Sequence, residues 1–475
     1  RQEYHRRIAQ VMVEQFSAEA QVHPEFVAKH YTEAGLLLES AQWWQRAGQS
    51  AVQRASNMEA IAHFMHGLDS AARLPASPKR DQLELGLQLA GGYALIPVKG
   101  WAAPETARAF TRAGDLCRQI DEAPQLFRAL WGLGAFHFVR GDQRQARDFA
   151  DQCLHLAQQG SPVDDLIEAH YLSGMVSCAR GEFASGQIDL EESIRLYGPE
   201  RRQLHTILYG QDPKASSGGW LAMGLWALGR PDQGLLRARD ALEFAQGSGH
   251  PFALARALAA VGFVHVYRRE PQATDGLLQA AIELCREQGF AYFGAVVSAF
   301  EGSNLTLLGR TQEGIKMIEE SIAMLRAIGS ELLFSVIFGH LAQAHLALGR
   351  YDDGLTAVAQ GLVIVDRNGE HWGEPELHRL KGELLAARHH AQSAPDPSVA
   401  DLDQAETSYR LAIATAQALQ ARSYELRAAT SLARLRSSQR AIPDALDALA
   451  AAYATFTEGF DTLDLRDAKA LLDAQ

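Results

Sequence analysis

Cysteine is scarce in this sequence of 475 residues, and its four members form no recognisable framework. Cys117, Cys153, Cys178 and Cys285 are far apart, and none belongs to a C-x-x-C pair. Each lies among apolar residues typical of helices. We therefore expect reduced core cysteines in a cytoplasmic protein, with neither disulfides nor a zinc site.

An excess of positive charge is also missing, because 45 Lys and Arg residues stand against 57 Asp and Glu residues. The net charge of −12 disfavours direct binding of nucleic acid, which needs a basic surface, although a local basic patch is compatible with it. The hydrophobic share of 47% excludes a disordered chain.

No long hydrophobic run favours a membrane. The longest stretch without Asp, Glu, Lys or Arg, residues 332–349, contains His340, Gln343 and His345, so a buried helix explains it better than a membrane span. An apolar signal core is lacking as well, and we interpret the chain as a piece of a longer polypeptide.

Motifs that carry chemistry are lacking too. The nearest approach to a phosphate-binding loop, residues 309–316, has Ile315 where lysine belongs. His63 and His66 have helical spacing but no H-E-x-x-H pattern, and there is no G-x-S-x-G elbow. We therefore predict no catalytic, cofactor or metal site, and no enzyme activity, in this chain.

An internal period is the strongest signal that the sequence does contain. Leu-Gly-Arg recurs at 228–230, 308–310 and 348–350. The equivalent positions lie 40 residues apart in two series, separated by an insertion of eight: Gly141 and Gly181, then Gly229, Arg269, Gly309 and Gly349. These positions mark turns, where glycine can adopt the left-handed conformation that ends a helix.

Small residues keep the same register on both sides of each turn. They form pairs twelve residues apart, such as Gly174 with Gly186 and Gly302 with Gly314. Glycine inside a helix costs about 1 kcal/mol relative to alanine, so its repeated use indicates two helices that cross closely. Alternating runs rich in Val, Ile and Thr are absent. We predict an all-α fold, an elongated right-handed α-solenoid of about ten or eleven helical hairpins.

The repeat also predicts how the chain is organised. Residues 1–56 are expected to form initial helices continuous with the solenoid, and 57–387 the repeats, with an insertion at 198–219. A loop at 388–400 and C-terminal repeats with a capping helix at 401–475 complete the chain. The breaks at 74–80, 198–219 and 388–400 are interpreted as loops, because the repeat resumes after each.

The insertion suggests a place for a partner. Insertions in a solenoid project from one edge, so Tyr209, Trp220, Arg268 and Arg269 are candidate contacts for an acidic or phosphorylated partner. A curved groove lined by the first helix of each hairpin is the other candidate surface. Alternatively, the insertion is a surface loop that tolerates extra length and binds no partner.

The hairpins, with small residues twelve apart where the helices cross, resemble the tetratricopeptide repeat, although the unit is longer than usual. More specifically, the chain is similar to the helical-repeat region of large bacterial signal-transduction ATPases, often fused to a class III adenylate or guanylate cyclase. The segments that carry this resemblance are His30-Tyr-Thr-Glu-Ala-Gly35, Trp44-Gln-Arg-Ala-Gly48, Tyr209-Gly-Gln-Asp-Pro213, Glu287-Gln-Gly-Phe290, Leu380-Lys-Gly-Glu-Leu384 and Glu458-Gly-Phe-Asp-Thr462.

The resemblance implies a regulatory role. The repeats would receive a protein or a small molecule as signal and bias an attached ATPase or cyclase module, which lies outside this chain. No catalytic residue can be carried over. Three alternatives stay open: the sensor region of a maltose-activator-like transcription regulator, another DNA-linked regulator with its helix-turn-helix domain elsewhere, and a fragment that contributes directly to nucleotide turnover.

Overall fold

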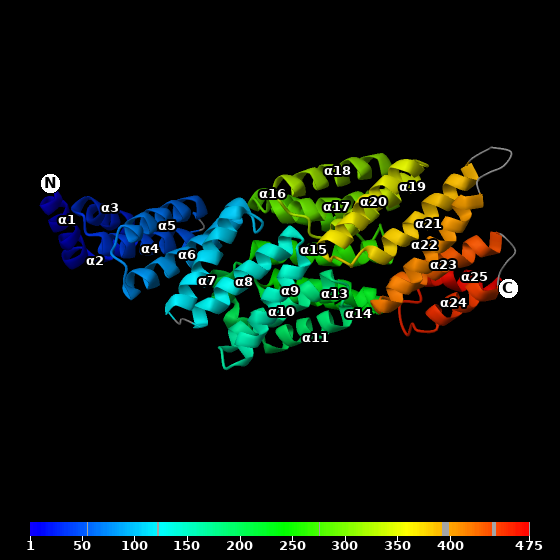
Figure 1. Cartoon of the computed structure of the whole chain (residues 1–475), viewed down its shortest axis with the longest axis horizontal. Helices are drawn as coiled ribbons and strands as arrows, with labels where there is room; N and C mark the ends of the chain where they lie inside the picture. The colour runs from blue at the N-terminus through cyan, green and yellow to red at the C-terminus, as the bar shows by residue number, and fades with distance from the viewer. Residues whose placement is uncertain (55, 121–122, 275, 392–398, 439–442, 475) are drawn as a thin grey trace.

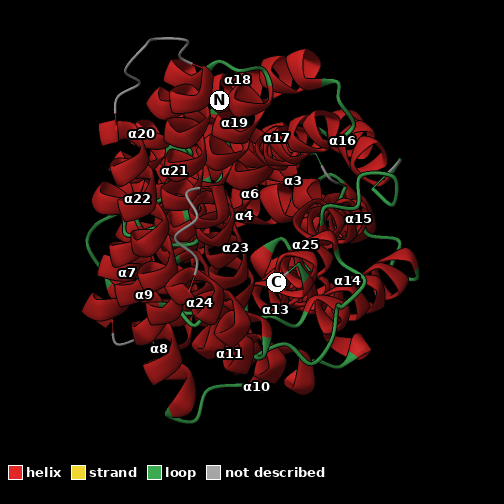
Figure 2. Ribbon diagram, turned by 90° about the vertical axis from the view of Figure 1, so that its right-hand side faces the viewer, coloured by secondary structure: helices red, strands yellow, loops and turns green. Residues whose placement is uncertain are grey.

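The computed structural model describes residues 1–54, 56–120, 123–274, 276–391, 399–438 and 443–474. Within these ranges the protein consists of 25 α-helices and one 3₁₀ turn, joined by loops and without a strand (Figure 2). The predicted all-α class is therefore confirmed. The molecule is elongated, and its two termini lie at opposite ends of the long axis (Figure 1).

Three short helices precede the regular repeat: α1 (Gln2–Gln15), α2 (Ser17–Val22) and α3 (Pro24–Ala34). Ten pairs of consecutive helices follow as hairpins. The pairs are α4 (Leu37–Gln53) with α5 (Asn57–Ala72), α6 (Pro78–Lys99) with α7 (Pro104–Ile120), α8 (Ala123–Arg140) with α9 (Gln143–Gln158), α10 (Val163–Ala179) with α11 (Phe183–Leu196), α13 (Pro213–Ala227) with α14 (Pro231–Gln246), α15 (Pro251–Arg268) with α16 (Leu277–Gln288), α17 (Ala291–Leu307) with α18 (Thr311–Ala327), α19 (Phe334–Ala347) with α20 (Tyr351–Asn368), α21 (Glu374–Ala391) with α22 (Val399–Ala418), and α23 (Arg422–Ser438) with α24 (Pro443–Tyr453). The final helix is α25 (Leu463–Asp473).

The turn of each regular hairpin has the conformation that the period predicts. Gly229 has φ +82°, and Arg269, which stands where the other turns have glycine, has φ +60°. In the Gly229 turn the backbone N–H of Gly229 donates to the carbonyl of Trp226, and that of Arg230 donates to Leu225. This pair of bonds satisfies carbonyls left free at the end of α13.

The close crossing of paired helices is also confirmed. A Cβ atom placed on Gly302 of α17 would lie 2.7 Å from the carbonyl oxygen of Gly314 on α18. One placed on Gly234 of α14 would lie 2.6 Å from the carbonyl oxygen of Ala222 on α13. Because only glycine lacks this atom, the small-residue columns let the two backbones of a hairpin touch.

The insertion at 198–219 is not the loop that we expected. It contains the 3₁₀ turn η1 (Pro199–Arg201), the helix α12 (Arg202–Tyr209) and the start of α13. The Asp212 carboxylate accepts hydrogen bonds from the backbone N–H groups of Lys214 and Ala215 and so caps α13. The interpretation failed because a helix of only two turns carries too few residues to show a period.

The other two predicted loops are shorter than expected. Within 74–80, helix α6 already begins at Pro78, where the hydroxyl of Ser77 accepts a hydrogen bond from the backbone N–H of Arg80. Within 388–400, α21 continues to Ala391 and α22 begins at Val399. Residues 392–398 lie outside the described part of the chain.

The stretch 332–349 contains a buried helix, as predicted: ten of the fourteen residues of α19 are buried. In the described ranges, none of the helices combines the length and the apolar character that a membrane crossing requires. All four cysteines are buried, which confirms their assignment to the core.

The superhelix coils back onto itself, which gives the molecule its second level of packing. The Ser330 hydroxyl donates to the carbonyl of Val139 at 2.7 Å, across 191 residues. The Ser423 hydroxyl donates to the carbonyl of Trp226, across 197 residues. Hairpin turns of one superhelical turn therefore pack against loops of the next. We call this set of contacts the closure.

Candidate functional site

Two cavities open on the inner side of the superhelix, and the first helices of consecutive hairpins line both. The first, which we call the polar cavity, has a volume of ≈ 270 Å³ and is lined by residues of α15, α17, α19, α21, α23 and α25 together with Arg269. First helices, which the repeat predicted to line a groove, therefore line this cavity. Because α15 and α25 meet here, the polar cavity lies at the closure.

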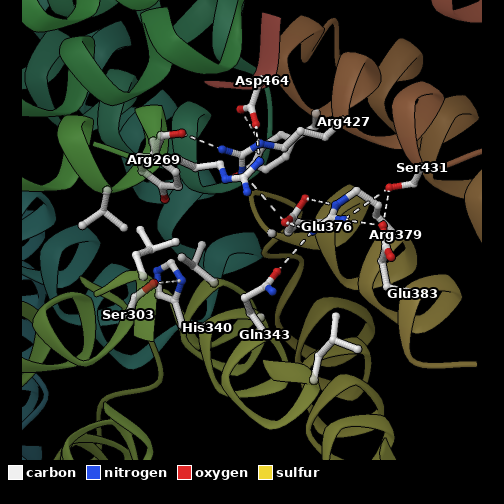
Figure 3. A pocket seen from close by; sticks show the side chains of 18 of the residues that line it. Arg269, Ser303, His340, Gln343, Glu376, Arg379, Glu383, Arg427, Ser431 and Asp464 are labelled. Carbon is white, nitrogen blue, oxygen red and sulfur yellow. Dashed lines mark hydrogen bonds and ion pairs between the residues drawn. The ribbon is translucent and has the colours of Figure 1, made fainter. Parts of the chain in front are cut away.

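The charged residues of the polar cavity form one continuous chain of alternating sign, of which Figure 3 labels the part from Glu383 to Arg269. Its members, in order of contact, are Glu383, Arg379, Glu376, Arg427, Asp464, Arg269, Asp467 and Arg434. The four arginines and four carboxylates cancel in charge. A ligand that enters must therefore exchange hydrogen bonds with groups that are already paired.

The centre of this chain is largely buried, with side chains at most 19% exposed, and its opposite charges form close ion pairs. Arg379 Nη2 lies 2.7 Å from Glu376 Oε1, and Arg427 Nε lies 2.7 Å from Asp464 Oδ2. Burial alone would raise the pKa of Glu376, but Arg379 and Arg427 outweigh it and lower that pKa to about 2. Glu376 is therefore a carboxylate at neutral pH.

His340 of α19 lines the same cavity. Its Nδ1 lies 3.1 Å from the Ser303 hydroxyl, and its Nε2 is buried with no hydrogen-bond partner among the described residues. Burial lowers the pKa of His340 to about 4, so the ring is neutral at pH 7. This ring edge is a hydrogen-bonding position that the fold leaves free.

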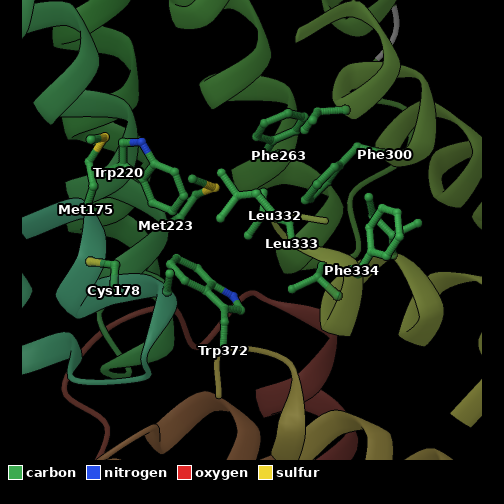
Figure 4. Close-up of a cluster of buried hydrophobic side chains, with 14 of the residues drawn as sticks. Met175, Cys178, Trp220, Met223, Phe263, Phe300, Leu332, Leu333, Phe334 and Trp372 are labelled. Atoms are coloured by element: carbon green, nitrogen blue, oxygen red, sulfur yellow. The ribbon is translucent and has the colours of Figure 1, made fainter. Parts of the chain in front are cut away.

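The second cavity, which we call the aromatic cavity, has a volume of ≈ 90 Å³ and lies between α8, α10, α13, α15 and α17. Its floor includes Trp131, Trp220 and Phe263, each at most 6% exposed. Leu332 and Leu333, from the loop before α19, close one side against Trp220 and Met223 (Figure 4). That loop also takes part in the closure through Ser330.

The four residues predicted to bind a partner do not form one exposed edge. Tyr209 is 1% exposed and its hydroxyl donates to the Asp165 carboxylate at 3.1 Å, while Arg268 is paired with Asp232 and Glu270. Trp220 lies in the aromatic cavity and Arg269 in the polar cavity. The expected exposure is wrong for Tyr209, Trp220 and Arg268, which are buried, and a partner-binding role of the four residues stays a prediction.

The reason is that α12 folds inward onto α10. His205 of α12 is fully buried, with its Nδ1 2.7 Å from the Glu168 carboxylate and its Nε2 3.1 Å from that of Asp164. Burial disfavours the charged imidazole, but these carboxylates prevail and raise the pKa of His205. The insertion is thus held by a buried polar contact and is part of the core.

Apart from Arg269, sequence reasoning missed the charged residues of the polar cavity. One signal was available: Glu376, Arg379 and Glu383 stand at i, i+3 and i+7, which places opposite charges on one face of α21. That face is the inner one. Clusters of three or more His, Cys, Asp or Glu side chains suited to a metal do not occur within the described ranges.

Comparison with known proteins gives distant likenesses. The chain matches no model of a known protein family. An uncharacterized protein of Rhizobium meliloti (strain 1021) is 21% identical over 405 residues, which is 85% of this chain and 39% of that protein. The chain thus spans about two fifths of the length of this relative.

Solved structures with similar outlines are also helical. A Rap protein complexed with competence and sporulation factor is 12% identical over 92% of this chain and 99% of its own, with a TM-score of 0.43. The apo form of the quorum sensor NprR from B. thuringiensis is 12% identical over 78% of this chain and 97% of its own, with a TM-score of 0.44. Yeast Tom70 is 10% identical over 100% and 96%, with a TM-score of 0.36.

Proposed function

We propose that this chain is a regulatory solenoid that senses a protein or small-molecule signal and relays it to an ATPase or nucleotide cyclase module of the same polypeptide. The observation that carries the proposal is the position of the polar cavity. Its walls come from α15 and α25, which are far apart in the sequence and meet only because the superhelix closes. A ligand at this place contacts both superhelical turns at once.

Binding in the polar cavity would change the closure, because a ligand competes with the ion pairs that line it. Every charged lining residue of the polar cavity already has an ion-pair partner, and the chain of pairs continues from α21 through α23 to α25. A polar ligand replaces some of these contacts with its own. Asp464 of α25 pairs with both Arg427 and Arg269. A shift of either arginine would therefore weaken the ion pairs that fix α25 to the rest of the superhelix.

The relay to another module is supported by the length of the relative from Rhizobium meliloti, of which this chain matches 39%. Each hairpin of a solenoid packs against its neighbours, and the rotation between neighbours sets the curvature of the whole. A change of coiling at the closure would therefore alter the orientation of both ends, and any attached module would experience it.

The test uses the full-length polypeptide that contains this chain. Arg269→Gln removes the ion pairs to Asp464 and Asp467 at a partly exposed turn, where folding should survive. Arg195→Gln is the matched control, because among the described residues Arg195 pairs only with the neighbouring Glu192 on the exposed face of α11. Nucleotide turnover is measured for both variants.

We expect the basal rate to change several-fold in Arg269→Gln and to stay at the wild-type value in Arg195→Gln. Equal rates in two folded variants would refute the relay through the closure. A polypeptide without a nucleotide-binding module would refute the attached ATPase or cyclase.

A further inference from the structure

Arg256 of α15 is the one charged residue among the described residues that line the aromatic cavity. Its guanidinium lies over the rings of Phe252 and Phe293, 5.7 Å from each centroid. In the part of the chain that the structure describes, it forms no ion pair with a carboxylate. The cation thus faces an apolar space without a counter-ion.

Two comparisons within the molecule show how other arginines at cavities or over aromatic rings are stabilised. All four arginines of the polar cavity have carboxylate partners. Arg326 also lies over two phenylalanine rings, Phe334 and Phe338, at 5.8 Å, but its side chain is exposed to water. Arg256 is partly buried and has no carboxylate partner among the described residues; its hydrogen-bonding neighbour is the hydroxyl of Tyr171. A partly desolvated guanidinium is stabilised by an anion that accepts its hydrogen bonds.

The shape of the aromatic cavity defines what else the ligand must contain. Arg256, Phe252 and Phe293 are partly exposed and form the mouth, whereas Trp220 and Phe263 are buried and form the floor. The volume of ≈ 90 Å³ is below the ~150 Å³ of a cavity known to hold benzene, so a short branched chain fits better than a ring. One arginine without a second cation suits a single negative charge.

We propose that the aromatic cavity binds a small branched-chain carboxylic acid, with its carboxylate paired to Arg256 and its alkyl group packed against Trp220 and Phe263. The carboxylate presents two oxygens in the plane that a guanidinium prefers, and the alkyl group displaces water from aromatic walls. The acid would bind whether or not the polar cavity receives a signal.

Calorimetric titration of the whole chain with 3-methylbutanoate tests the proposal, with quenching of tryptophan fluorescence as a second readout because Trp131 and Trp220 line the cavity. Two analogues separate the contributions: 3-methylbutanamide keeps the shape without the charge, and acetate keeps the charge without the branched chain. We expect saturable binding of 3-methylbutanoate, and at least tenfold weaker binding of each analogue.

The matched variants are Arg256→Gln and Arg326→Gln, which each remove one guanidinium from above two phenylalanine rings. We expect at least tenfold weaker binding in Arg256→Gln and unchanged binding in Arg326→Gln. Equal affinity of Arg256→Gln and wild type, or of the amide and the acid, would overturn the proposal. So would the absence of saturable binding to the folded wild-type chain. If Arg256→Gln fails to fold, the comparison of acid and amide on the wild-type protein still decides.

Discussion

Replacing Gly302 by alanine tests the crossing of α17 and α18, on which the whole repeat depends. The added Cβ would lie 2.7 Å from the carbonyl oxygen of Gly314 and 2.7 Å from Cγ1 of Ile318. The first of these atoms belongs to backbone and cannot rotate away. The two helices must therefore move apart by several tenths of an ångström.

The expected magnitude follows from two opposing effects. Alanine stabilises a helix by about 1 kcal/mol relative to glycine. Overpacking a well-filled contact costs about 1–3 kcal/mol, and a clash with backbone belongs near the upper end. We expect Gly302→Ala to lower the free energy of unfolding by about 1–2 kcal/mol.

Gly339→Ala is the matched control in α19, another first helix. The nearest atom to its added Cβ is Cδ1 of Leu380 at 3.9 Å, an ordinary contact. This variant should keep the helix-propensity gain and stabilise the protein by about 0.5–1 kcal/mol. Glycine-to-alanine substitution should thus change the free energy of unfolding in opposite directions at these two buried glycines.

Urea unfolding followed by circular dichroism measures both variants, and hydrogen exchange in α17 and α18 localises the effect. Exchange is needed because long repeat arrays need not unfold as one unit. A stabilised Gly302→Ala, or two variants with shifts of equal sign, would refute the backbone contact at the crossing.

Three further predictions concern groups that the fold buries or joins. Burial raises the pKa of Glu370 from 4.5 to about 7, although its carboxylate accepts hydrogen bonds from Leu333 and Ser335. The free energy of unfolding should therefore fall as the pH rises from 4.5 to 7. In urea unfolding at pH 5 and 8, Glu370→Gln should remove about 3 kcal/mol of this fall. The Glu458 carboxylate accepts from two backbone N–H groups at the start of α14, 2.9 Å each, so Glu458→Ala should cost about 1 kcal/mol in urea unfolding; an unchanged midpoint would contradict this capping role. The four thiols are at most 2% exposed, and a chromogenic aryl disulfide should label none of them until urea is added, so rapid labelling of the native protein would contradict their burial.

The amino-acid sequence by itself determined the hairpin. Gly229 and Arg269 could be assigned to turns, and Gly302 and Gly314 to a crossing, because these contacts join residues separated by one helix length at most. Such contacts leave a period in the sequence, since each repeat must solve the same packing problem. The burial of the four cysteines followed from the same local context.

The candidate site left no such period. Arg269 pairs with Asp464 across 195 residues, and Ser330 reaches Val139 across 191. These contacts depend on how the small rotation between neighbouring hairpins accumulates over one superhelical turn. The inward fold of α12 also escaped prediction, because its buried pair of His205 with Glu168 joins an irregular segment to a regular one. Tertiary structure alone decided where the superhelix closes and where the two cavities lie. Both depend on the rotation between hairpins summed over one superhelical turn, which the sequence of a single repeat does not reveal.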